Sequence, residues 1–335
     1  MFGYLRFLLA LLVMLSHLDI RFYGLNQGVI AVVIFYILAG YVVSYLYTNI
    51  IPKQIKDRKN NFKLFALQYS LFIKDRVKRI FPLYLFMAFL TLVFILITDF
   101  GKPHLTTLNI FSNLTIIPLN FYMWLDNSIL TNPKWWLIPP AWSLGTELQA
   151  YILLPFALVF PKIKYLFILL SLSIYIVANL NIIHPDYYGY RFIVGVFFIF
   201  MLGATLQKIS NSTQTKFDNY FILFILFVIF CLLSYVLYRN LEIKAYLLET
   251  SIGILFGVPI IYLLSKIKKT LPLNSFLGSL SYAIFLSHFL SIWLIKYLQI
   301  ETLKSMFTIG ISIIIGLIGV LFEINLLKKC RKNVD

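Results

Sequence analysis

An arginine and a histidine stand eleven residues apart in the first apolar stretch of the chain, which reads RFLLALLVMLSHLDIRFYGLNQG. Arg6 opens this stretch, His17 lies near its far end, and Asp19 follows closely. In a helix, eleven residues make about three turns, so Arg6 and His17 share one face about 16 Å apart along the axis. An imidazole can take a proton from a hydroxyl near neutral pH, or accept an acyl group. The alternative is a histidine that bonds a neighbouring helix as part of packing.

A basic cluster, DRVKRIFP, supplies a second chemical possibility. It contains Arg76, Lys78 and Arg79 just before an apolar run. Arg76 and Arg79 are three residues apart and would share a helix face. Guanidinium groups bind phosphate in a bidentate manner, so the pair could clamp a phosphate. The alternative is a topological signal that keeps this end of the next span in the cytoplasm.

The stretch PPAWSLGTELQAYILLP, residues 139–155, places an acid inside an apolar segment. Ser143, Glu147 and Tyr151 follow each other at four-residue steps and would share one helix face. A glutamate in such a segment is costly unless it is paired or lines a water-filled cavity. We therefore expect Glu147 to be functional, with Arg191 of the segment YYGYRF as a possible companion.

A fourth stretch, LGSLSYAIFLSHF, spans residues 277–289. Ser281 and His288 are seven residues apart and would share a helix face near the middle of the membrane. For His288, core packing and the lining of a tunnel are both open interpretations. Glu323, near the end of the last apolar run, is expected to form a salt bridge with a nearby Lys or Arg.

The amino-acid composition indicates the kind of fold that must hold these residues in place. Apolar residues make up 61% of the 335 residues and charged residues only 13%, which excludes an ordinary soluble protein. We expect an all-α, polytopic membrane helix bundle that forms one domain over 1–335. The two cysteines predict neither a disulfide framework nor a metal site.

The apolar runs predict about ten membrane-spanning segments: 4–20, 29–50, 80–98, 142–160, 164–183, 191–206, 220–239, 247–266, 276–300 and 305–327.

The distribution of positive charge predicts the orientation. With both termini in the cytoplasm, 21 of the 29 Lys and Arg residues lie on the cytoplasmic side and 8 on the other. The net charge of +16 is then largely the signature of membrane insertion, and we expect no nucleic-acid partner. This orientation predicts Arg6, Arg76 and Arg79 at the inner mouth, and His17 and Glu147 at a common depth near the outer face.

Two loops stand out. In the predicted cytoplasmic loop 51–79, apolar residues from Phe62 to Ile73 recur at helical spacing, as on a helix that lies in the membrane interface. The predicted outer loop 99–141 is rich in Trp, Tyr, Asn and Pro, and we expect its run 105–124 to be re-entrant or interfacial and not a span. Its aromatic residues could anchor to headgroups or form a platform for sugar rings.

Five motifs follow one another along the chain: Arg6 with His17, GLNQGVIAVVIFYILAGYVVS (24–44), RVKRIFPLY (76–84), WSLGTELQAYILLP (142–155) and SYAIFLSH (281–288). In this order they resemble the motifs of acyltransferase family 3, membrane proteins that O-acylate surface glycans. Asp75 departs from the two arginines with which the family's arginine motif often begins, and Ala39 stands where a serine is usual. No appended esterase-like domain is expected.

The resemblance implies transfer of an acyl group, with acetyl favoured, from cytoplasmic acyl-CoA to a carbohydrate or lipid-linked glycan at the outer face of the bacterial inner membrane. No bound cofactor or metal is implied. His17 would be the general base or a transient acyl carrier, and Glu147 would orient it. Arg6, Arg76, Lys78 and Arg79 would bind acyl-CoA. Pocket or tunnel residues would be Asp19, Trp142, Ser143, Tyr151, Arg191, Ser281, Tyr282 and His288.

The alternative from another class is a transporter or flippase of a glycan or small anion, in which the same charged residues line a substrate path. The sequence shows no inverted repeat, which argues against this alternative. A purely structural scaffold would leave the intramembrane Arg, His and Glu unexplained. O-antigen, exopolysaccharide, peptidoglycan and small glycosides all remain open as acceptors.

Overall fold

The computed structural model describes residues 2–55, 61–213, 215–238, 246–267, 269 and 271–332, and for Asn61 and 327–332 only the backbone. Several residues used in the sequence-based predictions lie outside this description. They are the basic residues Lys56, Arg58, Lys59, Arg239, Lys244 and Lys268, and the side chain of Cys330.

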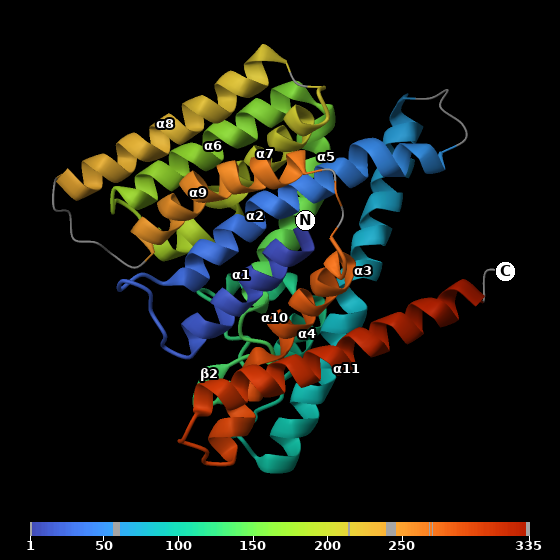
Figure 1. The fold of residues 1–335 in the computed structure, drawn as a ribbon, viewed down its shortest axis with the longest axis vertical. Coiled ribbons are helices and arrows are strands. Elements are labelled where there is room, and N and C mark those ends of the chain that lie inside the picture. Colours follow the sequence, from blue (N-terminus) through green and yellow to red (C-terminus); the bar gives the residue numbers. More distant parts are fainter. Residues whose placement is uncertain are drawn as a thin grey trace. The chain divides into compact units, whose positions relative to one another are not determined.

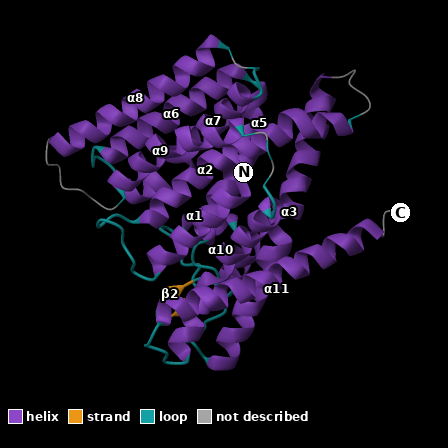
Figure 2. Cartoon of the chain, in the orientation of Figure 1, coloured by secondary structure: helices purple, strands orange, loops and turns teal. Residues whose placement is uncertain are grey.

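Helices make up most of the described chain, and Figure 2 shows strand only in one short pair. The two strands are β1 (Leu130–Thr131) and β2 (Lys134–Trp135), which pair antiparallel. The α-helices are α1 (Phe2–His17), α2 (Gln27–Tyr45), α3 (Asn61–Thr98), α4 (Thr107–Thr115), α5 (Ala141–Val159), α6 (Pro161–Asn179), α7 (Ile193–Ser210), α8 (Lys216–Tyr238), α9 (Leu247–Lys266), α10 (Asn274–Tyr297) and α11 (Lys304–Lys332). Short helical turns are η1 (Leu46–Ile50), η2 (Ile51–Gln54), η3 (Ile117–Phe121) and η4 (Tyr187–Arg191).

The predicted all-α membrane bundle is confirmed. Each of the ten predicted spans falls on a helix, and eight helices among the described residues are long and apolar enough to cross a membrane. The other two predicted spans correspond to α1, which has 16 residues, and α5, which carries the polar Glu147 and Gln149. The cytoplasmic placement of both termini stays a prediction.

The prediction for the segment before the third span needs a correction. We expected a separate interfacial helix around 62–73 and a span that starts at residue 80. The structure instead has one continuous helix, α3, of 38 residues with Pro82 inside it. The basic residues between the two apolar parts are good helix formers and leave no turn signal. By contrast, the expectation that 105–124 is not a span is confirmed, because this run contains only the 9-residue α4 and the turn η3.

The described chain forms two compact units, each made of separate segments (Figure 1). Unit 1 comprises 1–20, 77–145 and 270–335, and unit 2 comprises 21–76 and 146–269. The helices α3 and α5 each contribute residues to both units. The prediction of a single domain over 1–335 stays a prediction.

In unit 1, α10 packs against both α1 and α11. The start of α1 touches the start of α10, where the Gly3 amide donates to Asn274 Oδ1 at 2.9 Å. A Cβ on Gly3 would lie 1.7 Å from the Asn274 carbonyl oxygen, so only glycine permits this approach. The side-chain stack of His17 on His288 then brings the later parts of the two helices together. The two helices therefore run parallel.

In unit 2, α2 packs against α7 and α9 and is buried along most of its length. Gly40 of α2 and Gly203 of α7 make the α2–α7 contact close. A Cβ on Gly40 would lie 1.9 Å from the Phe200 carbonyl oxygen, and one on Gly203 would lie 1.8 Å from that of Ile37. Small residues at such crossings let the backbones of membrane helices meet. The glycine- and valine-rich second motif is thus a packing surface.

Candidate active site

His17 is the last residue of α1 and is exposed, whereas His288 in α10 is fully buried. Their rings are stacked, with centroids 5.3 Å apart and planes inclined by 21°. The ring of Phe289 contacts both, at 4.8 Å from His17 and 5.1 Å from His288. One face of the His17 ring is therefore held by α10, and the residue still reaches the surface of unit 1.

The buried imidazole of His288 is bonded to the backbone of its own helix. Its Nδ1 lies 3.3 Å from the Ile284 carbonyl oxygen, which can only accept, so Nδ1 carries a hydrogen. In the neutral ring Nε2 is then a hydrogen-bond acceptor, and it has no partner among the described residues. A buried acceptor without a partner costs free energy and is a feature expected where a ligand or water supplies the missing donor.

The predicted outer loop reaches this histidine pair through Trp135. The β1–β2 hairpin carries Trp135, whose ring lies 5.7 Å from that of Phe289. Phe289 thus contacts Trp135 on one side and His17 on another. Trp135, an aromatic residue of the predicted outer loop, therefore contacts the same phenylalanine as the proposed catalytic histidine. Whether the loop's aromatic residues bind sugar rings or headgroups stays a prediction.

Buried asparagines hold the loop in place, a role that sequence reasoning missed. Asn113 Nδ2 donates to the carbonyl oxygens of Asn109 and Asn127 at 2.8 and 3.3 Å, and Asn113 Oδ1 accepts from the Leu137 amide at 2.9 Å. Asn109, Asn113, Asn120 and Asn127 are all at most 2% exposed. The asparagines that interrupt the apolar run 105–124 therefore satisfy loop backbone that has no helical partner.

Arg79 forms a salt bridge with Glu323 of α11 at 2.5 Å, which confirms the expected partner type for Glu323. The side chain of Glu323 is 9% exposed and that of Arg79 is 38% exposed, so the guanidinium remains accessible. Beside this pair, Tyr282 of α10 donates its hydroxyl to the Ile80 carbonyl oxygen at 3.0 Å. The arginine motif of unit 1 is thus joined to α10 and α11.

The remaining predicted residues of unit 1 are placed as follows. Lys78 and Asp19 are exposed, and Arg6 is half-buried on α1. Ser143 and Ser281 donate their hydroxyls to backbone carbonyls three residues earlier, those of Pro140 and Gly278. Trp142 is buried, and its carbonyl oxygen accepts from Asn120 Nδ2 at 3.3 Å. The hydroxyls of both serines are therefore engaged locally.

In unit 2, Glu147 is linked through Tyr151 to Arg76. The Tyr151 hydroxyl donates to Glu147 Oε1, as the four-residue step predicts. The Arg76 guanidinium lies 5.9 Å from the centre of the Tyr151 ring, and Arg76 also pairs with Asp75. The predicted catalytic acid and one predicted phosphate-binding arginine thus contact the same tyrosine.

Arg191 lies close to this group in unit 2. Thr146, next to Glu147, donates its hydroxyl to the Arg191 carbonyl oxygen at 2.7 Å. The Arg191 guanidinium itself bonds Asp186 Oδ1 at 2.7 Å and lies over the rings of Tyr190 and Tyr246. Its charge therefore already has a carboxylate partner, Asp186, which sequence reasoning missed.

His17 belongs to unit 1 and Glu147 to unit 2. Their meeting at a common depth stays a prediction, as do the roles of all candidate residues. Within the described ranges, no three His, Cys, Asp or Glu side chains gather where they could hold a metal ion. In unit 1 the candidate reactive group is the imidazole of His17. In unit 2 it is the carboxylate of Glu147, which accepts a hydrogen bond from the Tyr151 hydroxyl.

Comparison with known proteins identifies the class. A family model described as an acyltransferase domain matches residues 2–323, nearly the whole chain. The chain therefore belongs to acyltransferase family 3, and it is a multi-pass membrane acyltransferase. An uncharacterized protein of Aquifex aeolicus (strain VF5) is 41% identical over 222 residues, which are 63% of this chain and 99% of that relative. No solved structure matches the chain.

Proposed function

We propose that the protein transfers an acyl group, with acetyl favoured, from acyl-CoA to a hydroxyl of a surface carbohydrate at the outer face of the bacterial inner membrane. The observation that carries this proposal is the placement of His17 in a chain of this family. His17 is exposed at one end of α1, it is held against His288 and Phe289, and it shares its helix with Arg6.

In the direct reaction, the acceptor hydroxyl gives its proton to His17 while its oxygen attacks the thioester carbonyl. The carbon–sulfur bond breaks, and the CoA sulfur receives the proton from the imidazolium. In the two-step alternative, His17 takes the acyl group first and passes it to the hydroxyl. Both routes give the same ester and the same free thiol.

The cationic residues are proposed to hold the donor. Arg6, Arg76, Lys78 and Arg79 would bind the phosphates of CoA, as guanidinium and ammonium groups do. About 16 Å of helix separates Arg6 from His17, a distance that an extended pantetheine arm can span. Glu147, with the Tyr151 hydroxyl fixed on it, would orient the imidazole or balance its charge.

Purified protein in lipid nanodiscs, incubated with radiolabelled acetyl-CoA and a surface-glycan fraction, tests the proposal. We expect labelled glycan and a stoichiometric amount of free thiol. His17→Ala should lose at least about a hundredfold in rate, the usual contribution of a general base. The matched control is His104→Ala, which removes another exposed histidine of unit 1.

Normal acylation by correctly inserted His17→Ala protein would contradict the role of His17. Accumulation of the glycan inside proteoliposomes that contain the same protein, with no CoA released, would instead support the transporter alternative. Mass spectrometry of surface glycans from cells with and without the protein then identifies the acceptor by its added acyl mass.

A further inference from the structure

A buried lysine in unit 2 lies outside the site described above. Lys164, in the first turn of α6, is only 8% exposed. Its Nζ lies 3.7 Å from Asp218 Oδ1, which is longer than a good hydrogen bond, and it also faces the rings of Tyr165 and Phe221. An ammonium has three N–H donors, and among the described residues none of the three has a closer acceptor.

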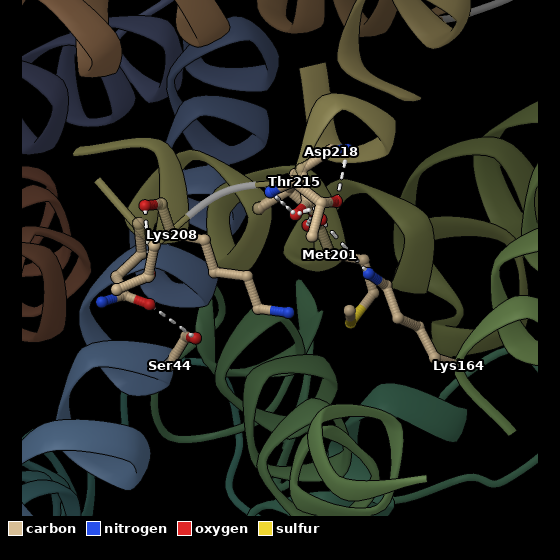
Figure 3. A network of polar contacts seen from close by, with 9 residues as sticks. Ser44, Lys164, Met201, Lys208, Thr215 and Asp218 are labelled. Carbon is tan, nitrogen blue, oxygen red and sulfur yellow. Dashed lines mark hydrogen bonds and ion pairs between the residues drawn. The ribbon is translucent and has the colours of Figure 1, made fainter. Parts of the chain in front are cut away.

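The carboxylate that faces Lys164, that of Asp218, already accepts hydrogen bonds at the start of its own helix, α8. Asp218 Oδ2 accepts from the Thr215 amide at 2.8 Å and from the Thr215 hydroxyl at 2.9 Å (Figure 3). Thr215 Oγ1 in turn accepts from the Asp218 amide at 3.3 Å. This reciprocal cap holds the start of α8. Only Oδ1 is left to balance Lys164.

A second lysine, Lys208 in the last turn of α7, lies near Lys164 and Asp218. Figure 3 shows the Lys208 side chain extending toward Lys164, and Lys208 interacts electrostatically with both Lys164 and Asp218. The Lys208 ammonium has no carboxylate within 4 Å among the described residues. Two lysines thus lie near one carboxylate, to which only Lys164 is paired, and this leaves an excess of one positive charge in a partly buried location. Such an excess is unfavourable unless an anion compensates it.

The geometry points to a binding site for a phosphate group, formed by Lys164 and Lys208 between the ends of α6, α7 and α8. A phosphate offers several acceptor oxygens to the uncommitted N–H donors, and a phosphodiester carries the single negative charge that the cluster lacks. The site differs from the Arg76 and Arg79 positions proposed for CoA, and it does not depend on the acyl-transfer reaction.

A membrane lipid and CoA can both supply this phosphate. The helices that flank the cluster expose large apolar side chains that could lie along lipid chains: Leu166, Leu169 and Leu170 on α6, and Leu223, Phe224 and Phe227 on α8. Basic sites between membrane helices bind anionic headgroups in this way. CoA carries phosphates as well, so both sources need to be tested.

Native mass spectrometry of the purified full chain in neutral detergent measures binding of each source against an analogue that lacks phosphate. The pairs are phosphatidylglycerol with diacylglycerol, and CoA with pantetheine. We expect Lys208→Ala and Lys164→Ala to weaken one of the two phosphate-containing probes at least about tenfold, and to leave the phosphate-free analogues unchanged. The matched control is Lys162→Ala, which removes an exposed lysine two residues from Lys164.

Lys164→Ala leaves Asp218 with its Thr215 bonds but without its lysine, and the variant could fold poorly. Lys208→Ala breaks no ion pair and therefore decides the question by itself, with Lys208→Arg expected to retain binding. If phosphatidylglycerol is affected, the ligand is a lipid, and if CoA is affected, the ligand is the acyl donor. Equal binding of both probes by Lys208→Ala, Lys162→Ala and the unchanged protein would overturn the site.

Discussion

His17 and His288 are separated by the same number of residues as Gly3 and Asn274, namely 271. Gly3 meets Asn274 at the start of α1 and α10, and His17 meets His288 fourteen residues later, about 21 Å along both helices. The two helices therefore stay parallel and in register over this length. Through this register, α10 positions the proposed catalytic ring on α1.

Substitutions of His288 test whether the stack positions His17. His288→Phe keeps an aromatic ring against His17 and removes a buried acceptor without a partner, so we expect its thermal stability to be unchanged or higher. His288→Ala opens a cavity and should cost about 2 kcal/mol or more. Thermal unfolding in detergent measures both effects.

Acyl transfer should be slower in His288→Ala than in His288→Phe, because only the latter still supports the His17 ring. Rates in both variants that equal that of the unchanged protein would show that the stack does not matter for His17. A rate that is equally low in both would assign a chemical role to His288 Nε2, beyond the stacking described here.

Arg79 is predicted to have a structural and a ligand-binding role, which a double variant separates. Arg79→Ala leaves Glu323 nearly buried without its partner and should destabilise the protein by about 1 kcal/mol or more, and Arg79→Ala with Glu323→Ala should recover stability. If Arg79 binds CoA phosphate, KM for acetyl-CoA stays raised in the double variant. Recovery of KM together with stability would leave Arg79 with the salt bridge alone.

Tyr151→Phe is predicted to slow acyl transfer without weakening acyl-CoA binding. The substitution removes the hydroxyl that donates to Glu147 and keeps the ring beneath Arg76. A hydrogen bond to a charged group contributes about 1.5 to 3 kcal/mol, so kcat should fall by about tenfold or more. Arg76→Ala is the comparison variant and should act mainly on KM. A Tyr151→Phe protein with unchanged kcat would remove Glu147–Tyr151 from the mechanism.

Gly40→Ala is predicted to disrupt unit 2. The added methyl would overlap the Phe200 carbonyl oxygen, and because this is backbone of α7 it cannot rotate away. We expect a loss of about 2 kcal/mol or more and a poor yield of folded protein. Gly310→Ala in α11 is the control, since a Cβ there meets nothing within 4 Å. Similar yields and melting temperatures for the two variants would contradict the close α2–α7 contact.

Much of the fold could be predicted because membrane spans are long, apolar and local in sequence. The glutamate–tyrosine contact was also local, since Glu147 and Tyr151 are one helical turn apart. Contacts between helices distant in sequence could not be predicted, and this is why His288 was not connected with His17. The Asp186 partner of Arg191 and the asparagines of the loop were missed for another reason. Asp186 is five residues from Arg191, and Asn113 contacts Asn127 and Leu137, so these contacts do not follow the spacing of three or four residues that a helical pattern predicts.

The offset of 271 residues also has a consequence for the synthesis of the protein. A ribosome that adds about 5 to 20 residues per second needs roughly 14 to 54 seconds to reach His288 after it has passed His17. For most of that time α1 can be in the bilayer while its partner helix has not yet been made. The proposed catalytic imidazole therefore acquires its support only when most of the chain has been translated.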